Sequence, residues 1–231
     1  MSTTKLKVMS AGAAEGPLRA LAPEFTRASG HEVEMAFSTA GALKDRLLGG
    51  EKADVMVLPA PAIEALEKDG RFVPGSRADL GRAACGVAVR DGMMAPDIST
   101  VEAFKRAMLH AQSIGATDPA HGGSSGIYLV GLFERLGIGD AVKPKMVLGK
   151  NGREVGLAVA GGQAELGITF TSEFVPIEGV RVVGPLPKEI GYLNVYSAAI
   201  PTGAAVEPAR ALLAFLTSPA GRQRFKSFGL E

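Results

Sequence analysis

In the first third of the chain, stretches with the apolar pattern of strands alternate with stretches in which apolar residues recur at helical spacing. This pattern predicts strands and helices in regular succession. Residues 5–9 indicate a short strand, and alternating apolar residues over 33–37 indicate a second. Residues 53–58 indicate a third strand, whose near-continuous apolar character is expected in a parallel sheet. Between them, apolar residues recur at helical spacing, and we expect helices from Pro17 to the glycine at 30, over 42–48 and over 62–68. Strand–helix–strand order with short connections predicts a parallel sheet in an α/β protein.

A second series of strands and helices follows, and two helices close the chain. The strands are expected at 83–89, 113–116, 145–148, 166–169, 180–183 and 192–200, and the helices at 101–109, 127–136, 153–160, 208–216 and 219–228. The last two helices need a sheet to pack on, so the second series interrupts the first. We expect a discontinuous lobe, 1–84 plus 196–231, and an inserted lobe, 85–195. Two chain crossings would form a hinge, with a small ligand bound in a cleft between the lobes.

Small residues follow several predicted strands at the positions where helices begin. They lie at 10–14, 38–41, 118–126 and 149–152. Strands of a parallel sheet present their carboxyl ends to one crevice, so these loops are expected to line a common rim. Ser124 and Ser125 are expected at the N-cap and in the first turn of a helix, where free N–H groups can cradle an anion. The alternative is an ordinary glycine loop with a serine cap.

Composition restricts the class of partner. The 231 residues include 25 Lys and Arg and 24 Asp and Glu, with a formal net charge of +1. This balance argues against nucleic acid or an anionic membrane surface as the main partner. The N-terminal residues lack the apolar segment of a signal peptide. We therefore expect a cytoplasmic protein, or a periplasmic one from which a leader has been removed.

Metal and disulfide chemistry are not expected. Cys85 is the single cysteine and the three histidines lie far apart, so no metal-ligand spacing is present. We expect no cofactor, and a monomer whose partner is a small anionic ligand.

Several segments resemble the periplasmic molybdate-binding proteins, which are type 2 solute-binding proteins of ABC importers. The resemblance covers nearly the whole chain and is carried by Lys7-Val8-Met9-Ser10-Ala11-Gly12-Ala13, Phe37-Ser38-Thr39-Ala40-Gly41-Ala42-Leu43, Ala53-Asp54-Val55-Met56-Val57, Asp118-Pro119-Ala120-His121, Gly126-Ile127-Tyr128, Glu165-Leu166-Gly167-Ile168 and the closing segments 215–221 and 228–230. It implies a two-lobed type 2 periplasmic-binding-protein fold of the α/β class. Each lobe would be a mainly parallel sheet flanked by helices, with a two-strand hinge.

The resemblance also implies which residues contact the ligand. The family binds a tetrahedral oxyanion through hydroxyl and backbone N–H groups of both lobes, without a counter-charge. The corresponding positions here are Gly12, Ala13, Ser38, Thr39, Ala40, Ser124, Ser125, Gly152 and Phe170. Ala13 and Phe170 stand where the family has hydroxyl side chains. Each lost donor to a desolvated anion costs on the order of 1–3 kcal/mol, so we expect an organic carboxylate in preference to molybdate.

Charged residues beside these loops are candidates for replacing the missing donors. Arg153 begins a helix, where its guanidinium could bind a carboxylate bidentately, and a solvated surface arginine is the alternative. His121 could donate to an anion or transfer a proton, and a structural role is the alternative. Glu15 and Glu173 are further candidate bases, or plain first-turn helix charges.

Two functions remain open from the sequence. We favour a solute-binding protein that closes on a small anion and delivers it to the membrane component of an ABC importer. The alternative is an enzyme, because aconitate isomerase resembles the same family. Such an enzyme would shift a proton between allylic carbons of a tricarboxylate, with His121 as the acid–base residue.

Overall fold

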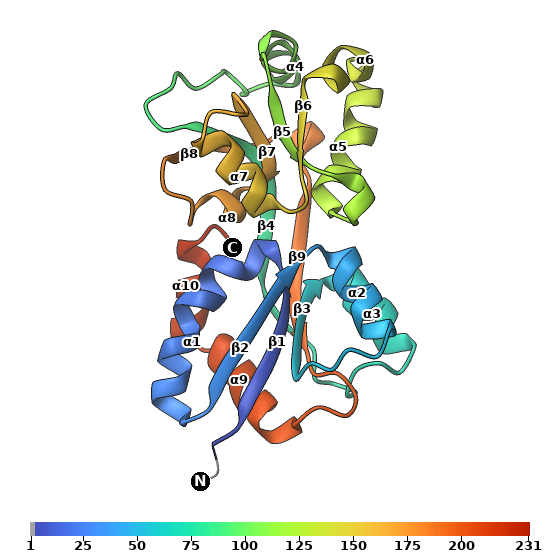
Figure 1. Ribbon diagram of the computed structural model, residues 1–231, viewed down its shortest axis with the longest axis vertical. Helices are drawn as coiled ribbons and strands as arrows, with labels where there is room; N and C mark the ends of the chain where they lie inside the picture. Colours follow the sequence, from blue (N-terminus) through green and yellow to red (C-terminus); the bar gives the residue numbers. More distant parts are fainter. Residues whose placement is uncertain (1–2) are drawn as a thin grey trace. The chain divides into compact units, whose positions relative to one another are not determined.

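The computed structural model describes residues 3–231 and divides into two compact units (Figure 1). Unit 1 is the chain up to Ala83 together with Asn194–Glu231, and unit 2 is Ala84–Leu193. Two strands, β4 (Ala78–Arg90) and β9 (Leu193–Ala199), carry the chain from one unit to the other. Each unit has strands and helices of its own.

The sheet of unit 1 has the strand order β2-β1-β3-β9. Its first three strands are β1 (Lys5–Ala11), β2 (Glu32–Ser38) and β3 (Val55–Pro59). β1 pairs in parallel with β2 and with β3, as the strand–helix–strand pattern predicted. β3 is buried at every position, which explains its continuous apolar sequence. β9 runs antiparallel to β3, because it brings the chain back from unit 2.

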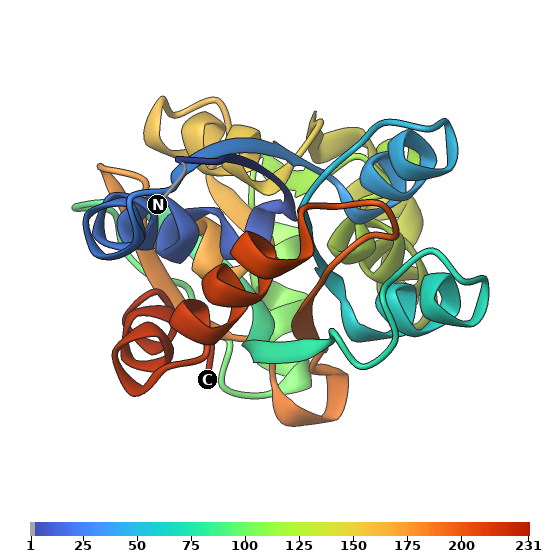
Figure 2. The same cartoon turned by 90° about the horizontal axis from the view of Figure 1, so that it is seen from below.

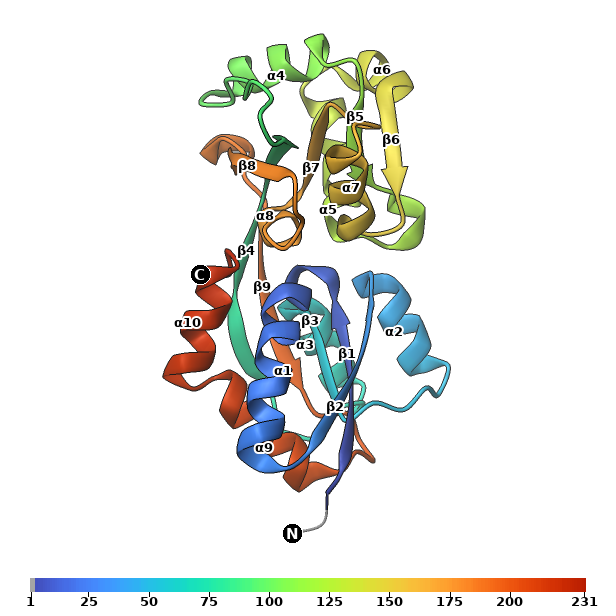
Figure 3. The same ribbon diagram turned by 60° about the vertical axis from the view of Figure 1, so that its left-hand side comes forward.

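Helices cover both faces of this sheet. They are α1 (Glu15–Ser29), α2 (Ala40–Leu48), α3 (Ala60–Lys68), α9 (Val206–Leu216) and α10 (Pro219–Ser227), with a short 3-10 helix, η1 (Gly12–Ala14), before α1. α1, α9 and α10 contact one another on one side of the sheet, and α2 and α3 lie on the other (Figures 1 and 3). Figure 2 shows α9 and α10, in red, beside the dark blue α1. Met9, Met56 and Leu58 of the sheet pack with Leu43 and Ile63 of α2 and α3 in one core cluster.

The sheet of unit 2 has the order β4-β7-β5-β6, with β8 on the other side of β4. Its remaining strands are β5 (Ile114–Thr117), β6 (Met146–Gly149), β7 (Leu166–Phe170) and β8 (Val180–Pro185). β5 is parallel to β6 and to β7, while β4 is antiparallel to β7 and to β8. The sheet is therefore mixed, and the expected parallel character holds for β5, β6 and β7.

The helices of unit 2 also pack on both faces. They are α4 (Val101–His110), α5 (Ser124–Arg135), α6 (Gly139–Val142), α7 (Gly152–Ala160) and α8 (Thr171–Phe174), with 3-10 helices η2 (Pro119–His121), η3 (Lys143–Lys145) and η4 (Lys188–Ile190). Side chains alternate across β4: Val87 and Val89 pack with α4 and α5, and Ala88 packs with α7 and α8. The helix expected at 127–136 begins earlier, at Ser124, and Thr171–Phe174 form the short helix α8.

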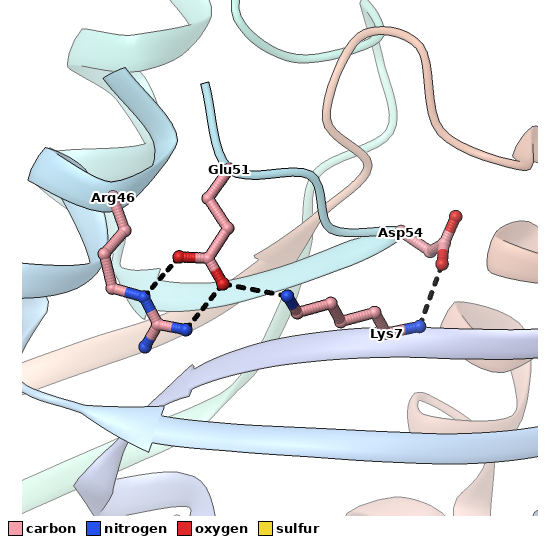
Figure 4. Close-up of polar contacts among 4 residues, drawn as sticks. All are labelled: Lys7, Arg46, Glu51 and Asp54. Carbon is pink, nitrogen blue, oxygen red and sulfur yellow. Dashed lines mark hydrogen bonds and ion pairs between the residues drawn. The ribbon is translucent and has the colours of Figure 1, made fainter. Parts of the chain in front are cut away.

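A polar network in unit 1 joins β1, α2 and the segment that precedes β3 (Figure 4). Arg46 donates from Nε and Nη2 to the two carboxylate oxygens of Glu51, each at 2.7 Å. Lys7 Nζ donates to the same carboxylate at 2.8 Å, and the Lys7 backbone N–H donates to Asp54 Oδ2 at 2.8 Å. The bonds from Arg46, and then those from Lys7, lower the pKa of Glu51 to about 2. The network therefore depends on an ionised Glu51.

We expect Glu51→Gln to destabilise unit 1 in a pH-dependent way. Glu51 titrates at about 2 in the folded chain and near its ordinary value of 4.5 when unfolded. Its contribution is therefore fully present above about pH 5 and is lost as the pH falls towards 2. The Tm of the variant should lie below that of the wild type at neutral pH, and the two should converge on acidification, measured by circular dichroism. Glu178→Gln is the control, because this exposed carboxylate forms no ion pair with any residue of 3–231. A difference that does not change with pH would contradict the prediction.

Candidate functional site

Three buried hydroxyl groups meet at the carboxyl ends of β5 and β7 in unit 2. Thr117 ends β5, Thr169 is the next-to-last residue of β7, and Ser125 lies in the first turn of α5. Ser125 Oγ lies 3.2 Å from Thr117 Oγ1 and 3.0 Å from Thr169 Oγ1. The side chains thus form one hydrogen-bonded chain across the strand ends.

The carboxylate of Glu173, on α8, terminates this chain of hydroxyls. Thr169 Oγ1 donates to Glu173 Oε2. An ionised carboxylate only accepts hydrogen bonds, and each hydroxyl has one proton to give. Thr169 therefore spends its proton on Glu173, so that Ser125 donates to Thr169 and Thr117 donates to Ser125. The charge of Glu173 therefore sets the direction of donation along all three hydroxyl groups.

Glu173 also lies against the beginning of α7. A Cβ atom built on Gly152, the first residue of α7, would be 2.1 Å from Cδ and Oε2 of Glu173. Only glycine permits this approach of a carboxyl group to the helix N-terminus, where the helix dipole favours negative charge. Burial, and to a smaller degree the Glu173 charge, raise the pKa of Cys85, which keeps that buried thiol neutral. The start of α7 and the hydroxyl chain together accommodate a carboxylate.

A close contact between the start of α5 and the end of β5 places Ser125 in this cluster of hydroxyl groups. A Cβ atom on Gly126 would lie 2.0 Å from the carbonyl oxygen of Thr117. The absence of a side chain at 126 lets the first turn of α5 pack directly on the end of β5. The N-cap of α5 is Gly123, and Ser124 is the first helical residue. The expectation of Ser124 as N-cap was wrong by one position, because the backbone of Gly123 takes that place without a side-chain cap bond.

Two other predicted ligand contacts of unit 2, Arg153 and Phe170, lie close in sequence to residues of this cluster, but the first is exposed and the second is buried. Arg153 is exposed at the second position of α7. Phe170 is buried, and its ring centroid lies 5.8 Å from that of Tyr192, which stacks on Tyr128. Phe170 is therefore part of a packed aromatic group.

His121 ends η2, in the loop that follows β5. Its side chain is 49% exposed, and Nδ1 lies 3.1 Å from Asp118 Oδ2. Asp118 also accepts a hydrogen bond from the Ala120 backbone, as expected for a residue that caps a loop. The carboxylate orients the imidazole beside the strand end.

In unit 1 the predicted residues lie at the carboxyl ends of β1 and β2. Gly12 and Ala13 form η1, directly after β1. Ser38 ends β2 opposite Ala11 in the register, so the two loops are neighbours. Thr39 is the N-cap of α2 and accepts a hydrogen bond from the Ala42 backbone at 3.3 Å, and Ala40 begins the helix.

Three side chains beside these predicted residues were not expected from the sequence: Thr117, Thr169 and Arg19. Thr117 and Thr169 belong to the hydroxyl chain, and the signal for them was a polar residue at the end of an otherwise apolar strand. In unit 1, the Arg19 guanidinium carbon lies 4.6 Å from the centroid of the Phe37 ring, and Arg19 Nε donates to Glu15 at 2.8 Å. The spacing of four residues between Glu15 and Arg19 on one helix could have indicated this pair.

Unit 2 also has a cavity of about 290 Å³ between α5 and the strands β5 and β6. Its lining is mainly apolar and includes Leu129, Val130, Phe133 and Leu148. Across residues 3–231, no group of three or more His, Cys, Asp or Glu side chains is arranged to hold a metal ion. No helix in that range combines the length and apolar character needed to cross a membrane.

Two glycines of α5 give a matched test of the close approach. We expect Gly126→Ala to lower the free energy of unfolding by about 1–3 kcal/mol, because the new methyl group collides with the Thr117 carbonyl. Gly131→Ala lies on the same helix and meets only the end of the Arg135 side chain, at 3.4 Å. It should raise stability by about 0.5–1 kcal/mol through helix propensity. Urea unfolding of both variants measures the difference, and equal stability of the two would refute the packing argument.

The chain is similar in sequence to proteins of known families. Residues 6–231 match the family described as bacterial extracellular solute-binding protein. The chain is 34% identical over 237 residues to an aconitate isomerase from a Pseudomonas species, covering 99% of this chain and 88% of the relative. It is 23% identical to the molybdate-binding protein ModA of Escherichia coli K12, covering 97% and 88%.

Solved structures show the same fold. The periplasmic molybdate-binding protein of Azotobacter vinelandii superposes with a TM-score of 0.79 at 21% identity, covering 98% of each chain. This similarity confirms the expected fold class, the two-lobed α/β fold of periplasmic binding proteins. The resemblance to the molybdate-binding family, with aconitate isomerase as a further relative, is also confirmed.

Proposed function

The chain belongs to the bacterial extracellular solute-binding protein family, and from this premise we propose that it binds a small organic carboxylate in preference to molybdate. The observation that carries the proposal is the carboxylate of Glu173. It lies against the start of α7 and accepts a hydrogen bond from Thr169. The start of α7 thus stabilises a carboxylate of the protein itself, and a ligand carboxylate that reaches this helix N-terminus competes with Glu173 for it.

The energetics favour a ligand that makes several directed contacts. Desolvating an anion costs several kcal/mol, whereas one helix N-terminus contributes roughly 0.3–1 kcal/mol and up to about 2 when partly buried. Hydrogen bonds to a charged group add about 1.5–3 kcal/mol each. We propose ligand contacts from Ser124, Ser125, Gly152, Arg153 and Phe170 in unit 2, and from Gly12, Ala13, Ser38, Thr39 and Ala40 in unit 1. Neither Ala13 nor Phe170 can supply the hydroxyl that a bare oxyanion would require.

The physiological setting follows from the family. We propose a monomer that carries its ligand to the membrane component of an ABC importer. Its compartment would be the periplasm.

Ligand preference can be measured directly by isothermal titration calorimetry. We expect citrate or trans-aconitate to bind, and molybdate and sulfate to bind at least tenfold more weakly, because the hydroxyl donors for a tetrahedral oxyanion are missing. Thermal shift with the same four anions provides an independent readout. Stabilisation by molybdate without stabilisation by the organic acids would overturn the proposal.

The role of Glu173 gives a second test. Glu173→Gln removes a negative charge from the start of α7 while keeping a side chain of the same size. Because the ligand carboxylate would no longer face a like charge, we expect its affinity to rise about threefold to tenfold. Glu178→Gln, an exposed residue five positions further along the chain, is the control and should leave the affinity unchanged. Weaker binding by Glu173→Gln would contradict this assignment.

A second candidate function is an allylic proton shift, and the 34% identity to an aconitate isomerase over 99% of the chain favours it. In such a reaction one C–H bond breaks, the double bond moves by one carbon, and a C–H bond forms at its other end. One acid–base group can remove and return the proton. We assign this role to His121, whose imidazole is oriented by Asp118.

Proton NMR with trans-aconitate in D₂O tests this second function. We expect conversion to the cis isomer with deuterium incorporation, and His121→Gln should reduce the rate by about 10²-fold or more. His110→Gln is the control, because His110 lies at the end of α4 and its Nδ1 contacts a backbone carbonyl of the same helix. Absence of turnover by the wild type would exclude the isomerase, and turnover unaffected by His121→Gln would exclude only His121.

A further inference from the structure

Arg19 lies beside the loops of unit 1 and has unused hydrogen-bonding capacity. It is in the second turn of α1, the helix that follows β1 and η1 (Figure 3). Its guanidinium group contacts the ring of Phe37 near the end of β2. We propose that Arg19 binds a carboxylate of the ligand and so selects ligands with more than one carboxylate. This assignment rests on the proposed function, because it presupposes a carboxylate ligand.

Two contacts fix the orientation of the guanidinium group. The Nε atom donates to Glu15 Oε1 at 2.8 Å, and the guanidinium carbon lies over the Phe37 ring, 4.6 Å from its centroid. Glu15 is largely covered, with 12% of its side chain exposed, whereas 61% of the Arg19 side chain is exposed. One edge and one face of the planar group are thus engaged. Orientation by protein contacts reduces the entropy lost when a ligand binds.

The remaining edge of the group is suited to a carboxylate. Among residues 3–231, Nη1 and Nη2 of Arg19 make no hydrogen bond. Two parallel N–H groups match the two oxygens of a carboxylate, and this bidentate geometry is specific to arginine. The edge is exposed, so a solute can reach it.

Helix stability does not explain this arrangement. Opposite charges four residues apart on a helix contribute about 0.2–0.5 kcal/mol, and screening of the largely exposed Arg19 by water keeps the contribution small. The position relative to the loops is more informative. Phe37 immediately precedes Ser38 and Thr39, so the guanidinium lies beside the turn between β2 and α2.

The loops themselves supply no positive charge. Residues 10–14 and 38–41 contain no lysine or arginine. Arg46 and Lys7, the cations of the network in unit 1, are engaged by the carboxylate of Glu51. Arg19 is also paired, with Glu15, but only through Nε, so its two Nη groups remain for a ligand with several negative charges.

Affinity measurements on a matched set of arginine variants test the proposal. We expect Arg19→Gln to weaken trans-aconitate binding by about tenfold to hundredfold in calorimetry. Arg19→Lys should restore only part of it, because lysine keeps the charge without the bidentate fork. Arg27→Gln is the control, since Arg27 lies on the same helix about 12 Å further along its axis. It should change the affinity less than twofold.

A monocarboxylate comparison separates specificity from general affinity. Lactate binding should be the same for the wild type and Arg19→Gln, or undetectable in both, while the preference for trans-aconitate over lactate should fall. Circular dichroism should show an unchanged fold, because Arg19 is exposed. Equal trans-aconitate affinity of the wild type and Arg19→Gln overturns the role of Arg19 alone. Failure of the wild type to bind any carboxylate overturns the proposed function, and the role of Arg19 with it.

Discussion

The contact between the start of α5 and the end of β5 is the constraint on which the unit 2 cluster depends. Gly126 lies so close to the Thr117 carbonyl that no side chain fits between them. This contact brings Ser125 within hydrogen-bonding distance of Thr117 and Thr169, residues from two different strands. A helix displaced by the width of one methyl group would separate the three hydroxyls and leave buried polar groups without partners, at a cost of about 1–3 kcal/mol each.

Glu173 then turns three neutral hydroxyls into an ordered array. Without a carboxylate at the end, each hydroxyl could donate in either direction. Because Glu173 accepts from Thr169, all three donate the same way, towards the start of α7. The array is therefore polarised before any ligand arrives. All three hydroxyl protons are thus used within the array, which fixes the position of the Glu173 carboxylate.

The local pattern of apolar residues predicted most of the fold. The candidate site was predicted less completely, because it depends on side-chain contacts between segments that are distant in sequence. The parallel pairing of β1, β2 and β3 followed from apolar runs and short connections. The antiparallel pairing of β4 with β7 did not, because pairing direction depends on the path of the chain across unit 2. Ser125 and Gly152 were found as small residues at helix starts. Thr169 was missed, because its role depends on residues 44 and 52 positions away in the chain.

The same difference between local and distant information explains which charged residues were predicted as ligand contacts. Arg153 was singled out because it begins a helix next to a predicted loop, and it is exposed there. Arg19 was not singled out, since nothing in the sequence indicates that its guanidinium stacks on an aromatic ring of β2. Unit 2 thus holds the Glu173 carboxylate in a fixed position at the end of its hydroxyl chain, and unit 1 holds an oriented cation, Arg19. Both groups are held by contacts between separate elements, Glu173 against the start of α7 and Arg19 against β2, so neither placement follows from the local sequence pattern.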